Sequence, residues 1–446
     1  MKKQLKISLL LALAAILLCG CNVSTVESMY TPPKRSQQHT NLQAAIDAAM
    51  NGLEYYAPRS GENQQTVQSA DLDGDGVVEH LLFARGTDEK PLKILVFRSA
   101  GESYTLSETI ESFGSSFDQV EYVNIDDRPG LEMVVGRQIS NQVVGSATVY
   151  TFAGGQAEQL MNGNYSNYLT CDLDEDKNSE LILFHPGDAE EDNGVVEYYT
   201  YENGVMERSC EAAMSQPVEH MKRIMFSKLA DGSPAVYVAS AVDENSMVTD
   251  AFAIVRGKFS NVVFSSDTDT NVKTLRNYYV YAADIDDDGI VELPDLVNMS
   301  AQTAAGYGRD IQYLIHWYAL QPNGDKVTKM YTYHNFGGGW YVTLDSLKQD
   351  PELVSSVSVV QESGAYCFYL KNEQSRQLEK IMTIYAFTGQ DREAQAVSDG
   401  RFVLYRTDGV VYAADLGIAS VQLDITEMKL INGFHMIHHE WKTGEM

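Results

Sequence analysis

The chain has 446 residues, of which 44% are hydrophobic, so its length suits two or three domains with buried cores. It carries 62 acidic and 33 basic residues, which give a formal net charge of −29. Nucleic acids and anionic membrane surfaces repel a protein this acidic, so the composition excludes a general electrostatic attachment to either.

The N-terminus has the layout of an export signal. Three lysines within the first six residues precede the apolar stretch 7–18, which is too short to span a membrane, and the tetrapeptide LCGC follows at 18–21. This tetrapeptide resembles a bacterial lipobox. The resemblance implies a lipoprotein signal peptide at 1–20 and a diacylglyceryl group on Cys21 that attaches the protein to the membrane. We therefore expect an extracytoplasmic lipoprotein at the cell surface; an ordinary secretory signal cleaved nearby is the alternative.

Two short elements follow the signal. Residues 21–40 are polar and contain a Pro-Pro pair, which predicts a flexible tether. Apolar residues then recur at helical spacing between Leu42 and Leu53, which predicts a short amphipathic helix that ends near Gly52.

Cysteines are sparse beyond Cys21. Only Cys171, Cys210 and Cys367 remain, an odd set with no disulfide framework and no paired-cysteine metal site. At most one disulfide can form among them.

An acidic loop recurs along the chain and is the main sign of its organisation. The stretch ADLDGDGVVEHLLFA begins at residue 70, and its loop starts at Asp71; related loops start at Asn124, Asp172 and Asp284. Successive intervals are 53, 48 and 112 residues, and the last is about twice the others. A degraded copy is therefore expected near residue 228, which makes five repeats. We number these loops 1 to 5 and count positions from the first residue of each.

Each loop leads into short strands. An apolar strand follows the loop (EHLLFAR, LEMVVGR, ELILFHP), then a strand rich in β-branched and aromatic residues, then a polar-alternating strand. Three to four short strands per unit are typical of a β-propeller blade. The sequence predicts a mainly β fold: a propeller of about five blades at 41–336, including the short N-terminal helix.

These loops and strands resemble the FG-GAP/VCBS-type repeats of bacterial surface propellers and integrin heads. The resemblance covers about residues 58–336, with three well-preserved loops and two degraded ones. It implies blades with metal loops on one rim. Five repeats would close a small ring alone, or a longer ring would borrow strands from elsewhere.

The loop pattern ends at the triple glycine 337–339. Residues 340–446 instead carry six β-like segments, from WYVTL to VVYAADL, and then an amphipathic segment, ITEMKLINGFHMI. We predict a separate α+β domain with an antiparallel sheet. It resembles a C-terminal module that follows such repeats in clostridial-type lipoproteins.

Loops 1, 3 and 5 place carboxylates at alternate positions, as calcium binding requires. Ca²⁺ takes six to eight oxygen ligands, and a tight loop delivers them from alternate residues. Positions one, three, five and nine offer side chains, and position seven offers its carbonyl. The predicted calcium ligands are Asp71, Asp73, Asp75, Val77 and Glu79 in loop 1; Asp172, Asp174, Asp176, Asn178 and Glu180 in loop 3; and Asp284, Asp286, Asp288, Ile290 and Glu292 in loop 5.

Three alternatives stand beside this prediction. The first alternative is that the loops are solvated acidic turns, and the second is that they are EF-hands. The third applies to loop 5 alone, as half of a dockerin. An EF-hand requires a glutamate at position twelve, where Leu82 and Leu183 lie in apolar strands. Loop 5 has Asp295 there, but a dockerin needs two tandem copies.

Loops 2 and 4 are expected to hold no metal. In loop 2, Arg128 stands at position five, where its guanidinium group can replace a cation. In loop 4, the first three ligand positions are Lys228, Ala230 and Gly232, none of which is a carboxylate.

No catalytic motif is present. The chain lacks a GxSxG elbow, a Walker loop and a zinc-protease helix, and the His cluster at 435–440 is interpreted as packing. The sequence therefore predicts a non-enzymatic, lipid-anchored, calcium-stabilised binding protein with an unknown protein or glycan ligand. An envelope assembly lipoprotein and a polysaccharide-acting enzyme are the alternatives.

Overall fold

The computed structural model describes residues 36–139, 145–187, 192–264, 272–277, 280–297, 313–335, 337–372 and 375–437. The predicted signal peptide, the lipidation site Cys21 and most of the predicted tether lie outside these residues. So do the last two histidines of the C-terminal cluster. Within the described part, the protein is mainly β, as predicted.

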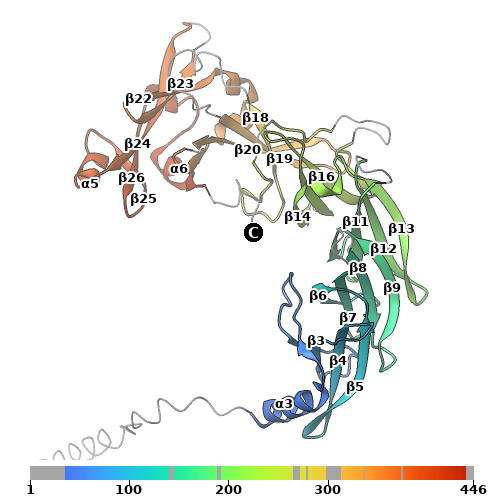
Figure 1. The fold of residues 1–446 in the computed structure, drawn as a ribbon. Helices are drawn as coiled ribbons and strands as arrows, with labels where there is room; N and C mark the ends of the chain where they lie inside the picture. The colour runs from blue at the N-terminus through green and yellow to red at the C-terminus, as the bar shows by residue number, and fades with distance from the viewer. Residues whose placement is uncertain are drawn as a thin grey trace, which may run out of the picture. The chain divides into compact units, whose positions relative to one another are not determined.

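The described strands form six antiparallel sheets (Figure 1). Their strands, sheet by sheet, are β1 (Glu54–Tyr55), β2 (Val67–Ala70), β3 (Glu79–Arg85), β4 (Leu92–Ala100) and β5 (Ser103–Ser112); β6 (Ser116–Val123), β7 (Glu132–Gln138), β8 (Gly145–Thr151) and β9 (Glu158–Tyr165); β10 (Asn167–Cys171), β11 (Glu180–His185), β12 (Val195–Glu202) and β13 (Val205–Ala213); β14 (Met221–Lys228), β15 (Pro234–Ala241), β16 (Met247–Val255) and β17 (Lys258–Asn261); β18 (Leu293–Val297), β19 (Tyr313–Leu320), β20 (Lys326–Asn335), β21 (Trp340–Thr343) and β27 (Phe434–Met436); and β22 (Val357–Glu362), β23 (Ala365–Lys371), β24 (Leu378–Thr388), β25 (Phe402–Arg406) and β26 (Val410–Leu416).

The first five sheets repeat one meander. In β2–β5, β6–β9, β10–β13 and β14–β17, each strand pairs with the next along the chain, and the predicted loop joins the first strand to the second. In the fifth repeat the first strand shrinks to a single bridge, Ala283 with Glu292, before β18. The predicted repeat, including its degraded fourth copy, is thus present as a structural unit.

The chain divides into two compact units, the first comprising 1–57, 65–70 and 77–113. Its helix α3 (Gln37–Ala49) packs Ile46 against Leu82 and Phe97 of the sheet. The helix begins earlier than predicted, inside the expected tether, because the Ser36 side chain accepts a hydrogen bond from the amide of His39 at 3.1 Å and caps it.

The second unit comprises 58–64, 71–76 and 114–446. Neighbouring repeats in it share apolar cores. One cluster joins Val149 and Met161 to Leu181, and the next joins Phe184 and Val196 to Val236. A strand that is buried on both faces reads as a nearly continuous apolar run, which explains sequences such as ELILFH in β11.

The six β-like segments beyond the triple glycine all form strands. Five of them, β22 to β26, make one antiparallel sheet. The first, β21, instead pairs with β20 and with β27, so that it extends the sheet of the fifth repeat. The short helices nearby are α4 (Ser346–Gln349), α5 (Arg392–Ala396) and α6 (Glu427–Asn432), with 3-10 turns at Val218–His220, Pro351–Ser356 and Ile418–Ser420.

The three described cysteines, Cys171, Cys210 and Cys367, form no disulfide. None of the helices that the structure describes between residues 36 and 437 has the length and apolar character needed to span a lipid bilayer.

Candidate metal-binding loops

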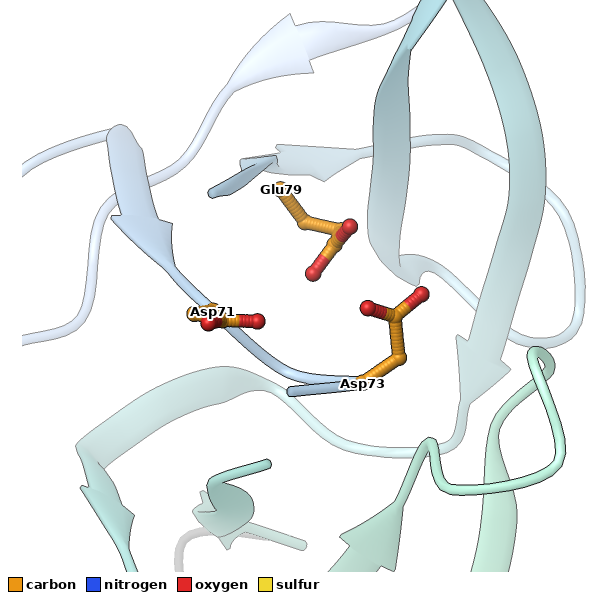
Figure 2. Close-up of side chains that lie close together, drawn as sticks. All are labelled: Asp71, Asp73 and Glu79. Atoms are coloured by element: carbon orange, nitrogen blue, oxygen red, sulfur yellow. The ribbon is translucent and has the colours of Figure 1, made fainter. Parts of the chain in front are cut away.

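Three groups of carboxylates in the described residues could hold a metal ion, one each in loops 1, 3 and 5. Each group consists of the side chains at positions one, three and nine, whose oxygens lie within 4.8 Å of one another. Figure 2 shows the first group, in which Asp71, Asp73 and Glu79 point toward a common space. The members of the groups are Asp71, Asp73 and Glu79; Asp172, Asp174 and Glu180; and Asp284, Asp286 and Glu292.

The backbone folds each loop around its first aspartate. The amide at position six donates to that carboxylate in all three loops: Gly76 to Asp71 at 3.0 Å, Lys177 to Asp172 at 3.0 Å, and Gly289 to Asp284 at 2.8 Å. Position six has φ near +80° each time. The turn therefore holds the carboxylate of position one at the centre of the loop.

Position nine has a role that its sequence position did not reveal. The glutamate accepts a hydrogen bond from the amide at position two, with Leu173 donating to Glu180 at 2.8 Å and Ile285 donating to Glu292 at 3.0 Å. One oxygen of each glutamate thus ties the loop to the start of the second strand. The other oxygen remains for a ligand.

Loop 3 contains an orphaned buried oxygen. Oδ1 of Asp172 is shielded from solvent and has no hydrogen-bond partner, although Oδ2 of the same carboxylate is bonded. Leaving a buried acceptor without a partner costs about 1–3 kcal/mol. A cation bound by Asp172, Asp174 and Glu180 would satisfy it, so the residues of loop 3 fit a metal ion.

The electrostatics of loop 3 also favour a bound cation. Burial, together with the neighbouring charges of Asp174, Asp176 and Asp172, raises the pKa of Glu180 to about 8. Burial also raises the pKa of Asp174, and Asp176 and Asp172 raise it further. Among the described residues, no lysine or arginine forms an ion pair with these side chains. Within the part of the chain that the structure describes, loop 3 therefore gathers negative charge that no ion-paired lysine or arginine balances.

Loop 5 has such a counter-charge. The ammonium group of Lys329, on β20, lies 3.8 Å from Asp286 and 3.5 Å from Glu292, and it donates a hydrogen bond to Asp288. Burial raises the pKa of Glu292 to about 7, while Lys329 acts in the opposite direction. Burial also opposes the ionised form of Asp288, but the hydrogen bond from Lys329 outweighs it and leaves the pKa below its usual value.

Loops 2 and 4 differ as expected from their side chains. In loop 2 the guanidinium of Arg128 lies 3.5 Å from the fully buried carboxylate of Asp126. In loop 4 the turn is closed by its own backbone, with the Leu229 amide donating to the Ser233 carbonyl at 2.8 Å. That both loops are free of metal stays a prediction.

The remaining predicted ligands lie outside the three groups. At position five stand Asp75, Asp176 and Asp288, each in its own loop. Position seven is diverse: the Asn178 side chain bonds to Asn124 and Asp127 of loop 2, which leaves only its carbonyl for an ion. Val77 and Ile290 offer carbonyls alone.

A repeated hydrogen bond links neighbouring loops. The amide at position eight of one loop donates to the carbonyl at position one of the loop before it: Leu131 to Asp71 at 3.1 Å, and Ser179 to Asn124 at 2.6 Å. Loops 1, 2 and 3 therefore form a connected series through main-chain atoms.

The structure decides between the alternatives for loop 5. Asp295 lies in β18, paired with His316 on β19, and binds Lys326 at 2.6 Å. A dockerin or EF-hand requires a helix at this point. Loop 5 therefore belongs to neither class.

A polar pocket lies among the first strands of successive repeats. Its volume is about 740 Å³, and it is lined by residues 61–63 and by parts of β6, β10 and β14. Glu121 contributes a carboxylate that accepts hydrogen bonds from Thr170 and Gln119, and its burial raises its pKa. Arg223 and Lys222 bring positive charge to the same pocket.

No protein-family profile matches the chain, and no curated protein matches it. It is similar to distant solved β-rich structures. A protein from Lactobacillus plantarum has 13% identity, covering 73% of this chain and 85% of that one, with a TM-score of 0.28. The exotype rhamnogalacturonan lyase YesX has 12% identity, covering 73% and 72%, with a TM-score of 0.28. The rhamnogalacturonan lyase YesW has 10% identity, covering 73% and 74%, with a TM-score of 0.28. At these values the similarity carries no argument about activity.

Proposed function

We propose that this protein is a calcium-stabilised, extracytoplasmic binding protein without catalytic activity, built as a β-propeller of the FG-GAP/VCBS type and anchored through a lipid on Cys21. The repeated four-stranded meanders with shared cores support the propeller, since blades pack in this manner. The signal-like N-terminus supports export and anchoring.

The observation that carries the metal role is the buried, unpartnered Oδ1 of Asp172, placed beside Asp174 and Glu180. All the ligands offered are oxygens, from carboxylates and backbone carbonyls. Hard cations such as Ca²⁺ prefer these ligands, whereas zinc and copper favour histidine and cysteine. The ion would neutralise like charges and satisfy the orphaned oxygen, so its role is to stabilise the loops.

The pocket among β6, β10 and β14 is the proposed ligand site. It offers carboxylate, guanidinium and ammonium groups, side-chain amides such as Asn63, and the side chain of Tyr168. Hydrogen-bonding groups mixed with apolar and aromatic side chains suit a ligand with polar and apolar faces, such as an oligosaccharide. We expect the immobilised wild-type protein to retain a glycan, and we expect the Arg223→Ala variant to lose this retention.

Calcium dependence of the melting temperature tests the metal role. Ca²⁺ at 100 times its dissociation constant should stabilise the protein by about 2.7 kcal/mol per site. Asp174→Asn should lower the melting temperature in Ca²⁺ and leave it nearly unchanged in chelator, measured by scanning calorimetry. As a matched control, Asp231→Asn in loop 4 should act equally in both conditions. A wild-type melting temperature that does not respond to chelator would contradict the metal role.

The two alternative functions predict different experimental results. An envelope assembly protein would co-purify with one stoichiometric partner from detergent-solubilised envelope, without retaining glycan. A polysaccharide-acting enzyme would cleave a member of a glycan panel and lose that activity when one carboxylate, such as Glu121, is replaced.

A further inference from the structure

Arg223, on β14, lines the pocket among β6, β10 and β14 and has no acidic partner among the described residues. Its side chain is half-buried, its Nε atom is shielded from solvent, and no described residue accepts a hydrogen bond from that nitrogen. The chain has 62 acidic residues against 33 basic ones, so an unpaired guanidinium group is not explained by a shortage of carboxylates. Withdrawing a charged donor from water without a partner costs free energy, which an anionic ligand would recover.

A second cation stands beside it in the sequence. Lys222 also lines the pocket, and it too forms no ion pair within the described part of the chain. Neighbouring side chains of a regular strand point to opposite faces of the sheet. Here Met221 pairs with Ser240 and Arg223 with Ala239, so Lys222 is the extra residue of a β-bulge. The bulge breaks the alternation, which explains how two consecutive cations line one pocket.

The carboxylates that line the pocket do not balance these cations. Glu121 accepts a hydrogen bond on each oxygen, from Gln119 and from Thr170, and Glu62 is exposed. Neither glutamate forms an ion pair with either cation in the residues that the structure describes. A negative charge to pair with the guanidinium group is therefore left for the ligand to supply.

We propose that the ligand of this pocket is an acidic glycan, in which Arg223 binds the carboxylate of a uronic-acid unit and Lys222 adds a second positive charge. The inference rests on the proposed function, since it takes the pocket to be a glycan site, and it names the class of glycan. A planar guanidinium group donates two parallel hydrogen bonds to one carboxylate, a geometry that an ammonium group lacks.

The rest of the pocket suits the sugar rings that carry the carboxylate. Its volume of about 740 Å³ is that of a site for a molecule of several rings, far more than a small inorganic anion fills. Tyr168, Leu169 and Ile224 provide aromatic and apolar surface for the faces of the rings, and Asn167 provides a side-chain amide for hydroxyl groups. A free phosphate or sulfate ion would contact the cations and leave this surface uncovered.

The overall charge explains why the pocket needs its own cations. A protein with a net charge of −29 repels a polyanion at long range. Attraction to an acidic glycan must therefore act at short range, from cations that no carboxylate of the protein has neutralised. Arg223 and Lys222 meet this requirement.

A matched pair of ligands tests the inference. Each uronic-acid tetrasaccharide of a panel is titrated into the full chain beside its neutral counterpart, in which the carboxylates have been reduced to primary alcohols. Isothermal titration calorimetry measures both affinities. We expect the wild type to bind at least one acidic member about 10- to 100-fold more tightly than its reduced counterpart, because charge-assisted hydrogen bonds replace neutral ones.

Three variants locate the effect. Arg223→Gln should abolish the preference for the acidic member, because glutamine keeps a polar side chain and loses the charge. Lys222→Gln should weaken binding of the acidic member by only about two- to fivefold, because its side chain is exposed. The matched control is Lys228→Gln, which removes an exposed lysine from the other end of β14, outside the pocket, and should bind as the wild type does. Circular dichroism verifies the fold of each variant.

The outcomes separate this inference from the proposed function. Equal binding of the acidic and reduced members would overturn the acidic class, while the glycan role of the pocket stands. A preference for the acid that survives in Arg223→Gln would overturn the assignment of the carboxylate to Arg223. Binding of no member of the panel would overturn the glycan role and the inference with it. If Arg223→Gln fails to fold, the two ligands still decide the class on the wild type, and Arg223→Lys decides the residue: an undiminished preference in that variant overturns the two-bonded contact.

Discussion

Lys177, at position six of loop 3, has a left-handed backbone conformation; at the same position loops 1 and 5 have glycine. Its φ is +80°, against +84° for Gly76 and +83° for Gly289. A side chain with a Cβ is strained in this region by about 1–2 kcal/mol. Loop 3 therefore stores strain at position six that its counterparts avoid.

Replacing Lys177 by glycine should stabilise the protein. The relieved strain exceeds the entropy that glycine adds to the unfolded chain, so we expect a net gain of roughly 0.5–1 kcal/mol in the free energy of unfolding. Urea denaturation in saturating Ca²⁺ measures it.

Lys177→Ala is the control, because it removes the same charge and keeps the strain; it should not stabilise. The reverse change, Gly289→Ala, should cost about 1 kcal/mol through φ alone, since an added Cβ there meets no atom within 4 Å. Equal effects of Lys177→Gly and Lys177→Ala would show that charge, not strain, governs this position.

At the scale of elements, the contact between loops 1 and 2 depends on Gly130. A Cβ on this residue would lie 2.4 Å from the Leu72 carbonyl oxygen and 3.2 Å from the Asp73 carbonyl carbon, both main-chain atoms. The neighbouring amide of Leu131 donates to the Asp71 carbonyl in the same contact. The two loops can approach only because position seven of loop 2 has no side chain.

Gly130→Ala should therefore lower the free energy of unfolding by about 1–3 kcal/mol, because backbone must move to admit the methyl group. Chemical denaturation followed by tryptophan fluorescence measures the change. Gly154→Ala is the matched control: nothing lies within 4 Å of its added Cβ, so it should change stability little. A neutral Gly130→Ala would mean that the two loops are not in contact.

The strands themselves could be predicted from local sequence, but the strands with which they pair could not all be predicted. Apolar runs bounded by acidic turns mark β3, β7 and β11, because a strand covered on both faces must be apolar along its length. The pairing of β21 with β27 is different, since the partner comes from the far end of the chain.

The same limit applies to the site. The spacing of the carboxylates predicts which side chains converge, because all lie within one loop. Lys329 was missed, because its arrival depends on a bulge and on the pairing of two later strands. Its only sequence signal is a lysine in a strand position where two other repeats have serine.

At the scale of the whole molecule, the net charge of −29 acts against the folded state. Like charges repel more strongly in a compact chain than in an extended one, and salt screens them over about 10 Å at 0.1 M. Stability should therefore rise with ionic strength, and it should rise most when no divalent ion neutralises the loops.

We expect the melting temperature in chelator to increase between 20 mM and 500 mM KCl by more than it does in saturating Ca²⁺. Paired thermal scans in the two conditions test this. Choline chloride in place of KCl controls for specific binding of potassium in the loops. A melting temperature that falls with salt in chelator would show that attractive ion pairs, such as Lys329 with Asp288, outweigh the general repulsion.

The hydrogen bond from position eight of one loop to position one of the loop before it has an evolutionary consequence. Both partners are main-chain atoms, so the bond survives any change of side chain that keeps the turn. Loop 2 illustrates this: it contains Arg128 and Pro129 and still bonds to the loops on both sides. After duplication of an ancestral repeat, each copy could exchange a captured ion for a covalently attached charge without losing its place in the series. The loops then differ in how much of their counter-charge the protein itself supplies.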